Sequence, residues 1–204
     1  MGESDTIVLI GPIGAGKSTV SRLLAEPTGW RRCALDDVRW AYYAERGYDR
    51  SYAQQMAVSD AGVLGEIRYT RPYEVHAIER VLAAHTPGIL DFGASNSVFD
   101  EEPLLVRVER ALAPFPHVVL LMPSADPDES IAILRERLTA MIRAGGEEPG
   151  DELWRVNEYF VRHPSNYRLA THVVYTGHST PDVVCADVLA ACGLAPRLAK
   201  EGHQ

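Results

Sequence analysis

The sequence that decides the fold is Gly11-Pro12-Ile13-Gly14-Ala15-Gly16-Lys17-Ser18-Thr19. It follows an apolar run, Thr6–Ile10, and opens a helical pattern over Lys17–Glu26. In a G-x-x-x-x-G-K-S loop, glycines let backbone N–H groups turn inward around phosphates, and the helix amino terminus adds positive potential. Lys17 is expected to reach the β- and γ-phosphates, and Ser18 to ligate Mg²⁺. The predicted nucleotide-binding residues are Gly11, Gly14, Ala15, Gly16, Lys17, Ser18 and Thr19.

Apolar runs and helical patterns alternate along the chain, which is typical of a parallel sheet with crossover helices. Strands are predicted at Thr6–Ile10, Cys33–Leu35, Gly88–Asp91, His117–Met122 and His172–Tyr175. Helices are predicted at Lys17–Glu26, Asp37–Arg46, Glu102–Ala113, Asp128–Arg143, Asp151–Pro164 and Pro181–Cys192. Between Tyr48 and His85 we expect two helices, separated near Arg71-Pro72, because proline disfavours a helical residue before it. The pattern predicts an α/β fold in one domain.

Composition and charge limit the classes of molecule that the protein is expected to bind. The net charge of −8 and the pI of about 5.4 disfavour binding to long nucleic acid or anionic membranes. The three cysteines, Cys33, Cys185 and Cys192, are expected to be reduced packing residues. No histidine pairs with a cysteine or carboxylate at ligand spacing, so no zinc site is predicted. The sequence shows no signal-peptide pattern and no long apolar run. We expect a cytoplasmic monomer or homodimer with a small-molecule substrate.

The order of motifs resembles that of the shikimate kinase family and its neighbours among the nucleoside-monophosphate-kinase-like P-loop kinases. Besides the phosphate loop, the likeness rests on Leu35-Asp36-Asp37-Val38-Arg39, Asp91-Phe92-Gly93-Ala94-Ser95-Asn96, Leu134-Arg135-Glu136-Arg137-Leu138 and Arg162-His163-Pro164-Ser165-Asn166-Tyr167. It implies a three-layer α/β/α fold with a five-stranded parallel sheet in the order 2-3-1-4-5, and ATP with Mg²⁺ as cofactors. It also implies a single P-loop kinase domain over 1–196, with an acceptor-binding insertion at about 37–86, a lid at about 138–155 and a tail over 197–204.

The acidic pair after the second strand is similar to two family patterns. Shikimate kinases carry an Asp-x-Asp there, whose carboxylates face the acceptor hydroxyl and Mg²⁺. Polynucleotide 5′-hydroxyl kinases carry a D-D-x-R, in which the first Asp is the base and the Arg holds a substrate phosphate; Asp36-Asp37-Val38-Arg39 matches it to the letter. A carboxylate here can orient a hydroxyl and accept its proton. Asp36 is therefore a candidate for catalysis, metal and acceptor binding, and Asp37 and Arg39 for acceptor binding. The alternative is that Asp36 caps a helix starting at Asp37.

Further candidates follow from the same resemblance. Asp91, at the end of the third strand, is expected to hold a Mg²⁺-bound water, unless it is a turn residue. Gly93-Ala94-Ser95 stands where shikimate kinases carry a glycine triplet, so Gly93 is a substrate candidate and the acceptor pocket has a different shape, which makes shikimate doubtful. Arg162 and Arg71 resemble the arginines that grip the substrate's anionic group, a role suited to the guanidinium fork.

The lid should supply an arginine that offsets charge on the transferring phosphoryl group. Arg135, Arg137 and Arg143 are available, and the first two cannot share one helix face. Arg137 and Arg143 are taken as catalytic candidates, together with Lys17 and Asp36. Gly177 and Ser179, after the last strand, are expected to contact the adenine, unless they form a plain turn.

Together these features predict an ATP-dependent kinase that phosphorylates a hydroxyl group of a metabolite; an amine or guanidine acceptor is less favoured. One alternative is a nucleoside or polynucleotide 5′-hydroxyl kinase, supported by D-D-x-R and opposed by the acidic charge. Another is a nucleotide-dependent ATPase switch without an acceptor. The long insertion between the second and third strands argues against the switch.

Overall fold

The computed structural model describes residues 6–60 and 62–194. Its sheet has five strands in the order β2-β3-β1-β4-β5, and every pair is parallel. The strands are β1 (Ile7–Ile10), β2 (Arg32–Ala34), β3 (Ile89–Asp91), β4 (His117–Met122) and β5 (His172–Tyr175). The predicted α/β fold and strand order are confirmed.

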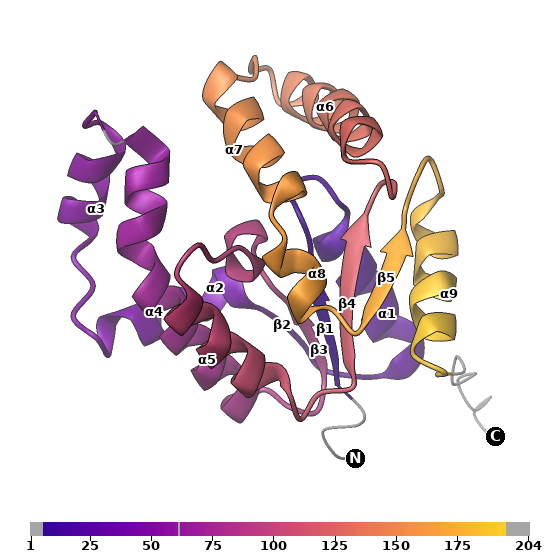
Figure 1. The fold of residues 1–204 in the computed structure, drawn as a ribbon. Helices are drawn as coiled ribbons and strands as arrows, with labels where there is room; N and C mark the ends of the chain where they lie inside the picture. The colour runs from indigo at the N-terminus through magenta and orange to yellow at the C-terminus, as the bar shows by residue number, and fades with distance from the viewer. Residues whose placement is uncertain (1–5, 61, 195–204) are drawn as a thin grey trace.

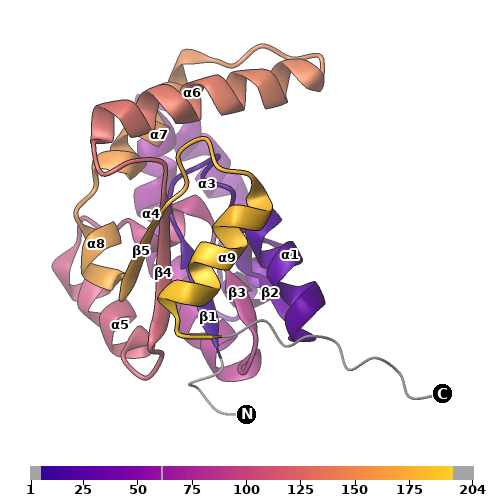
Figure 2. The same ribbon diagram turned by 90° about the vertical axis from the view of Figure 1, so that its right-hand side faces the viewer.

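Helices cover both faces of the sheet, as Figures 1 and 2 show. One face carries α1 (Lys17–Thr28) and α9 (Pro181–Ala191), and the other α4 (Gly62–Ala84), α5 (Glu102–Leu112) and α8 (Ser165–Leu169). Successive strand residues point to opposite faces. Ile7 and Leu9 therefore join the core under α1 and α9, whereas Val8 and Ile10 join the core under α4 and α5. This burial on both faces explains why the strands are continuously apolar.

Two helical groups project from this core (Figure 1). The first is α3 (Arg50–Ala57) with the first part of α4; α2 (Leu35–Ala44), which precedes it, packs against α4 beside the core. The second is α6 (Pro127–Ala144) and α7 (Asp151–Arg162), which lie beyond the carboxyl ends of the strands. These groups overlap the predicted insertion, about 37–86, and the predicted lid, about 138–155, whose roles stay predictions. The predicted tail, 197–204, lies outside the described residues. Within those residues no helix is long and apolar enough to cross a bilayer.

The predicted helix break at Arg71-Pro72 is wrong. Helix α4 continues through Pro72, and the two helices separate between Ala57 and Gly62. A proline inside a helix costs about 3 kcal/mol. The cost is offset by the buried face that follows, where Val75, Ile78 and Val81 have no exposed surface and each contributes about 1.5–3 kcal/mol. Tertiary burial thus overrides the local preference.

The start of α2 lies earlier than predicted. Strand β2 ends at Ala34, and the helix begins at Leu35. Ala34 is the N-cap residue, so Asp36 lies inside the first turn of the helix. The alternative that Asp36 caps a helix starting at Asp37 is therefore wrong. Two short elements were not predicted, the 3₁₀ helix η2 (Ala94–Ser97) and α8.

Candidate active site

The phosphate loop connects β1 to α1 and packs tightly on both sides. A Cβ atom at Gly11 would collide with the carbonyl oxygen of Leu121 in β4, and the residue has φ 141°. Only glycine combines this backbone conformation with such a close approach. On the other side, Leu138 of α6 packs against Gly14. The loop is therefore held between the sheet and the lid helix.

Lys17 is buried inside this loop, with 8% of its surface exposed. Its Nζ donates hydrogen bonds to the carbonyl oxygens of Gly11, at 2.7 Å, and Pro12, at 2.9 Å. Burial lowers the pKa of Lys17 to about 8, while the charges of Asp91 and Asp36 act in the opposite direction. Both predicted carboxylates thus lie within electrostatic reach of Lys17.

Asp36 lies against Gly93, as the strand order requires of residues that follow β2 and β3. A Cβ atom at Gly93 would be 2.8 Å from Asp36 Oδ1 and 2.7 Å from Asn96 Oδ1. Arg39 Nη1 forms an ion pair with Asp36 Oδ1 at 2.9 Å, while Asp37 is exposed one position further along α2. The structure therefore brings Asp36, Arg39 and Gly93 together.

Asp91, the last residue of β3, is only 4% exposed and has two partners. Arg32 forms an ion pair with its Oδ2 at 2.9 Å, and the Ser21 hydroxyl donates to the same atom at 3.2 Å. Arg32 also donates to Ser21, at 2.7 Å. Ser18, the other metal candidate, is exposed at the start of α1. Sequence reasoning missed Ser21 and Arg32, whose side chains have no motif spacing to Asp91.

A cavity of about 260 Å³ extends from the phosphate loop toward the start of α9. Arg137 lies in its wall and donates to the Thr176 hydroxyl, at 3.2 Å, and to the carbonyl oxygen of Gly177. The lining residues are Gly14, Ala15, Gly16, Thr19, Val20, Arg137, Thr176, Ser179, Pro181 and Val184. Of the predicted residues, those that line this cavity are therefore Gly14, Ala15, Gly16, Thr19, Arg137 and Ser179, and Gly177 adjoins it through its bond to Arg137.

Comparison with known sequences identifies the family of this site. A shikimate kinase from Streptomyces coelicolor is 33% identical over 189 residues, which cover 92% of this chain and 95% of the relative. The chain belongs to the shikimate kinase family. No protein-family model matches it.

Solved structures of kinases share the fold of this family member. A shikimate kinase from Acinetobacter baumannii in complex with shikimate has a TM-score of 0.57, 17% identity and 91% coverage of both chains. A gluconokinase from Sinorhizobium meliloti has the same TM-score and identity, with 92% of this chain and 91% of that chain covered. At these identities the likeness shows the fold alone. Family membership and fold together make the protein an ATP-dependent kinase that phosphorylates a hydroxyl group of a small molecule.

The other arginines that the family resemblance singled out are paired within this kinase. Arg71, 2% exposed, forms an ion pair with Glu74 at 2.7 Å and donates to the carbonyl oxygen of Ser95 at 2.6 Å. Arg162, the last residue of α7, forms ion pairs with Asp128 and Glu158. Neither joins the group formed by Asp36, Arg39 and Gly93 through a hydrogen bond or ion pair.

The lid arginines divide as their spacing predicts. Arg135 stacks on Trp154 at 5.2 Å, on a different side of α6 from Arg137. Arg143 is exposed and forms an ion pair with Glu148 at 3.0 Å. Of the two catalytic candidates on α6, the structure thus places Arg137 at the cavity beside the phosphate loop and Arg143 at the surface.

Asn157 of α7 is a site residue that sequence reasoning missed. Its Oδ1 accepts from the Ile13 backbone N–H at 2.9 Å, and its Nδ2 donates to the Ile13 carbonyl oxygen at 3.2 Å. The side chain is 4% exposed. An asparagine inside an amphipathic helix carries no sequence signal for a phosphate loop in the opposite half of the chain.

Asn96 and Tyr43 are further polar residues beside Asp36. Asn96, 1% exposed, has no hydrogen-bond partner for either amide atom, and the Tyr43 hydroxyl is likewise buried without a partner. Burial raises the pKa of Tyr43, and the neighbouring charge of Glu74 raises it further. Buried polar groups without partners are costly and rare, so these two residues indicate a place where a ligand supplies hydrogen bonds.

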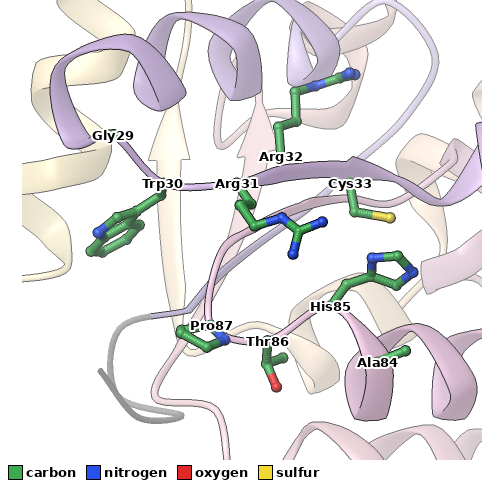
Figure 3. A pocket seen from close by; sticks show the side chains of 9 residues that line it. All are labelled: Gly29, Trp30, Arg31, Arg32, Cys33, Ala84, His85, Thr86 and Pro87. Carbon is green, nitrogen blue, oxygen red and sulfur yellow. The ribbon is translucent and has the colours of Figure 1, made fainter.

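A second cavity, of about 280 Å³, lies before the amino ends of β2 and β3 (Figure 3). Arg31 extends toward His85 and Cys33, while Arg32 points the opposite way, toward its partner Asp91 (Figure 3). None of the predicted site residues lines this cavity. It therefore lies outside the candidate active site.

Proposed function

We propose that this kinase transfers the γ-phosphoryl group of Mg-ATP to a hydroxyl group of an uncharged, hydroxyl-rich metabolite. Asp36 orients that hydroxyl and accepts its proton. The observation that carries the proposal is the position of the Asp36 carboxylate, which lies against Gly93 and influences the pKa of Lys17. In open α/β sheets, ligands bind at the carboxyl ends of the strands, where these residues lie.

The donor side fits ATP with Mg²⁺. The phosphate loop has the backbone geometry for phosphates, and Lys17 is poised beside it. Ser18 and Asp91 offer the oxygen ligands that Mg²⁺ prefers. We assign Asp91 Oδ1 to a metal-bound water, because Ser21 and Arg32 both donate to Oδ2. Magnesium, when bound, supplies charge neutralisation at the phosphates.

Arg137 is the arginine that we assign to the transferring phosphoryl group. It lies at the nucleotide cavity, where its bonds to Thr176 and Gly177 hold the guanidinium beside the phosphate loop. A guanidinium here offsets charge that develops on the phosphoryl oxygens. Arg143 is less suited, because Glu148 already neutralises it at the surface.

The acceptor class follows from which side chains retain hydrogen-bonding capacity. Arg71 is paired with Glu74 through Nη1, which leaves its buried Nη2 without a partner, and Arg162 is paired with Asp128 and Glu158, so each guanidinium already has a carboxylate beside it that offsets its charge. Asn96 offers neutral donor and acceptor groups beside Asp36, and Tyr43, further along the same helix as Asp36, offers a neutral hydroxyl. Neutral groups of this kind match the hydroxyls of a polyol or sugar. The acceptor is therefore an uncharged molecule with several hydroxyl groups.

Matched pairs of acceptors test this class. ATP consumption is measured with sorbitol against gluconate, and with methyl shikimate against shikimate, the substrate named for the bacterial relatives. We expect the uncharged member of each pair to react with the higher kcat/KM. Preference for both acids would overturn the neutral class while leaving the kinase activity in place.

Substitution of the acidic pair tests the role of Asp36. The Asp36→Asn variant cannot accept a proton, so the transfer rate should fall about 10²–10⁴-fold. Its stability should change by about 1 kcal/mol or less, because the change removes an exposed ion pair with Arg39. Asp37→Asn is the matched control and should keep its activity. A full-speed Asp36→Asn enzyme contradicts the proposal, and loss of activity in Asp37→Asn alone transfers the role to Asp37.

The polynucleotide alternative depends on Arg39 holding a substrate phosphate. In the structure Arg39 is paired with Asp36, and the chain's net charge is −8. We expect no measurable binding of a single-stranded oligonucleotide at physiological salt. Tight binding that weakens steeply with salt would favour the alternative.

Sedimentation measurements test the prediction that the protein is a monomer or a homodimer.

A further inference from the structure

Three potential metal ligands converge at the edge of the sheet opposite the phosphate loop. His117 is the first residue of β4, His172 is the first residue of β5, and Cys192 directly follows α9. One ligand atom from each side chain lies within 4.8 Å of the other two. The amino ends of β4 and β5 and the end of the closing helix thus meet around one point.

The sheet register and the length of α9 create this arrangement. His172 pairs with Val119, and His117 shares a face with Val119 because strand side chains alternate. The two imidazole rings stack with centroids 5.7 Å apart and planes inclined by 27°. Helix α9 packs on the same face (Figure 2), so its end brings Cys192 to both rings. Since the three residues lie on separate elements, no local spacing in the sequence predicts the site.

We propose that His117, His172 and Cys192 bind one zinc ion. Two imidazole nitrogens and a thiolate sulfur are ligands that zinc prefers. Tetrahedral zinc, with bonds of about 2.0–2.3 Å, places its ligand atoms roughly 3.3–3.8 Å apart. A side-chain shift of about 1 Å therefore closes the site, and water fills the fourth position.

Binding involves no oxidation or reduction. The S–H bond of Cys192 breaks, its proton passes to solvent, and the sulfur donates its electron pair to Zn²⁺. The ion links the amino ends of β4 and β5 to the end of α9, at the end of the sheet opposite Lys17. Its role is to stabilise this edge of the fold, and phosphoryl transfer does not depend on it.

Cobalt titration of the full-length, chelator-stripped protein tests the site. Co²⁺ bound by a thiolate gives a charge-transfer absorption in the near ultraviolet, and we expect it to saturate at one ion per chain. Zn²⁺ should displace the cobalt and raise the melting temperature. Cys192→Ser should abolish the absorption, and His172→Gln should weaken metal binding about 100-fold or more, at least the cost of losing an outer-shell partner.

Cys185→Ser is the matched control, because Cys185 also lies on α9 but contacts Val20 instead. It should keep the cobalt absorption and the response to zinc. The proposal is overturned if no saturable thiolate band forms, or if the band survives in Cys192→Ser. Should Cys192→Ser fail to fold, His172→Gln decides, since the His172 ring is partly exposed. Unchanged metal affinity in that variant would also refute the site.

Discussion

The lowered pKa of Lys17 makes ATP binding depend on pH in a range where most lysines do not titrate. In the free protein its pKa is about 8, so the side chain is about 90% charged at pH 7 and about 10% charged at pH 9. ATP phosphates favour the charged form and raise the pKa on binding. Binding therefore takes up a proton above neutral pH, and affinity falls as pH rises.

The expected change is close to a tenfold weakening of ATP binding between pH 7 and pH 9. Titration calorimetry with saturating Mg²⁺ at pH 7, 8 and 9 measures the dissociation constant. Repeating the pH 8 titration in buffers of different ionisation enthalpy measures proton uptake, expected at about half a proton per ATP. A lysine with the ordinary pKa of about 10.4 would remain almost fully charged at pH 9.

Lys17→Arg is the control for this linkage. A guanidinium remains charged throughout the range, so the variant should bind ATP more weakly but with the same affinity at pH 7 and pH 9. If wild-type affinity is equally flat and no proton is taken up, burial does not lower the pKa of Lys17. In that case the enclosed geometry of its ammonium group, bonded to Gly11 and Pro12, does not persist in solution.

Three further substitutions test particular contacts. Asn157→Ala leaves the part-buried N–H of Ile13 without its acceptor. We therefore expect the KM for ATP to rise by a factor corresponding to about 1–3 kcal/mol. Unchanged steady-state kinetics would contradict this. Gly93→Ala places a methyl group against Asp36 Oδ1, so kcat should fall while ATP binding persists, and calorimetry beside kinetics distinguishes the two effects. Pro72→Ala removes the proline from the interior of α4 and should stabilise the protein by up to about 3 kcal/mol, as measured by urea unfolding; a loss of stability would show that Pro72 packing outweighs the strain.

The sequence predicted the sheet well because its strands are buried on both faces. Val118–Leu121 form a continuous apolar run with almost no exposed surface, and such runs are readily recognised between turn residues. Helix boundaries were harder where local and tertiary preferences disagree. Pro72 favours a break, but the buried face of α4 maintains the helix. Leu35, fully buried, serves as the start of a helix rather than the end of a strand.

The candidate site was predictable only where chemistry is encoded in consecutive residues. The phosphate loop and the acidic pair at Asp36 each follow a strand, and parallel strands bring their carboxyl ends to one edge. The residues that pair with Asp91 and with the phosphate loop lie elsewhere in the sequence. Arg32 reaches Asp91 from the neighbouring strand, and Asn157 reaches Ile13 from the lid helix. Such pairings depend on the register of the sheet and the path of the lid, which no local spacing reveals.

The helices α6 and α7, which overlap the predicted lid, contact the phosphate loop at two points. Leu138 of α6 packs on Gly14, while Asn157 of α7 bonds both backbone groups of Ile13. A change in the loop at Ile13 or Gly14 would therefore alter the contacts with α6 and α7. Arg137 lies on α6 one residue before Leu138, so any movement of α6 also repositions its guanidinium. Under the proposed function, ATP binding and the position of the Arg137 guanidinium would therefore be linked, and closure of α6 and α7 would exclude water before the phosphoryl group is transferred.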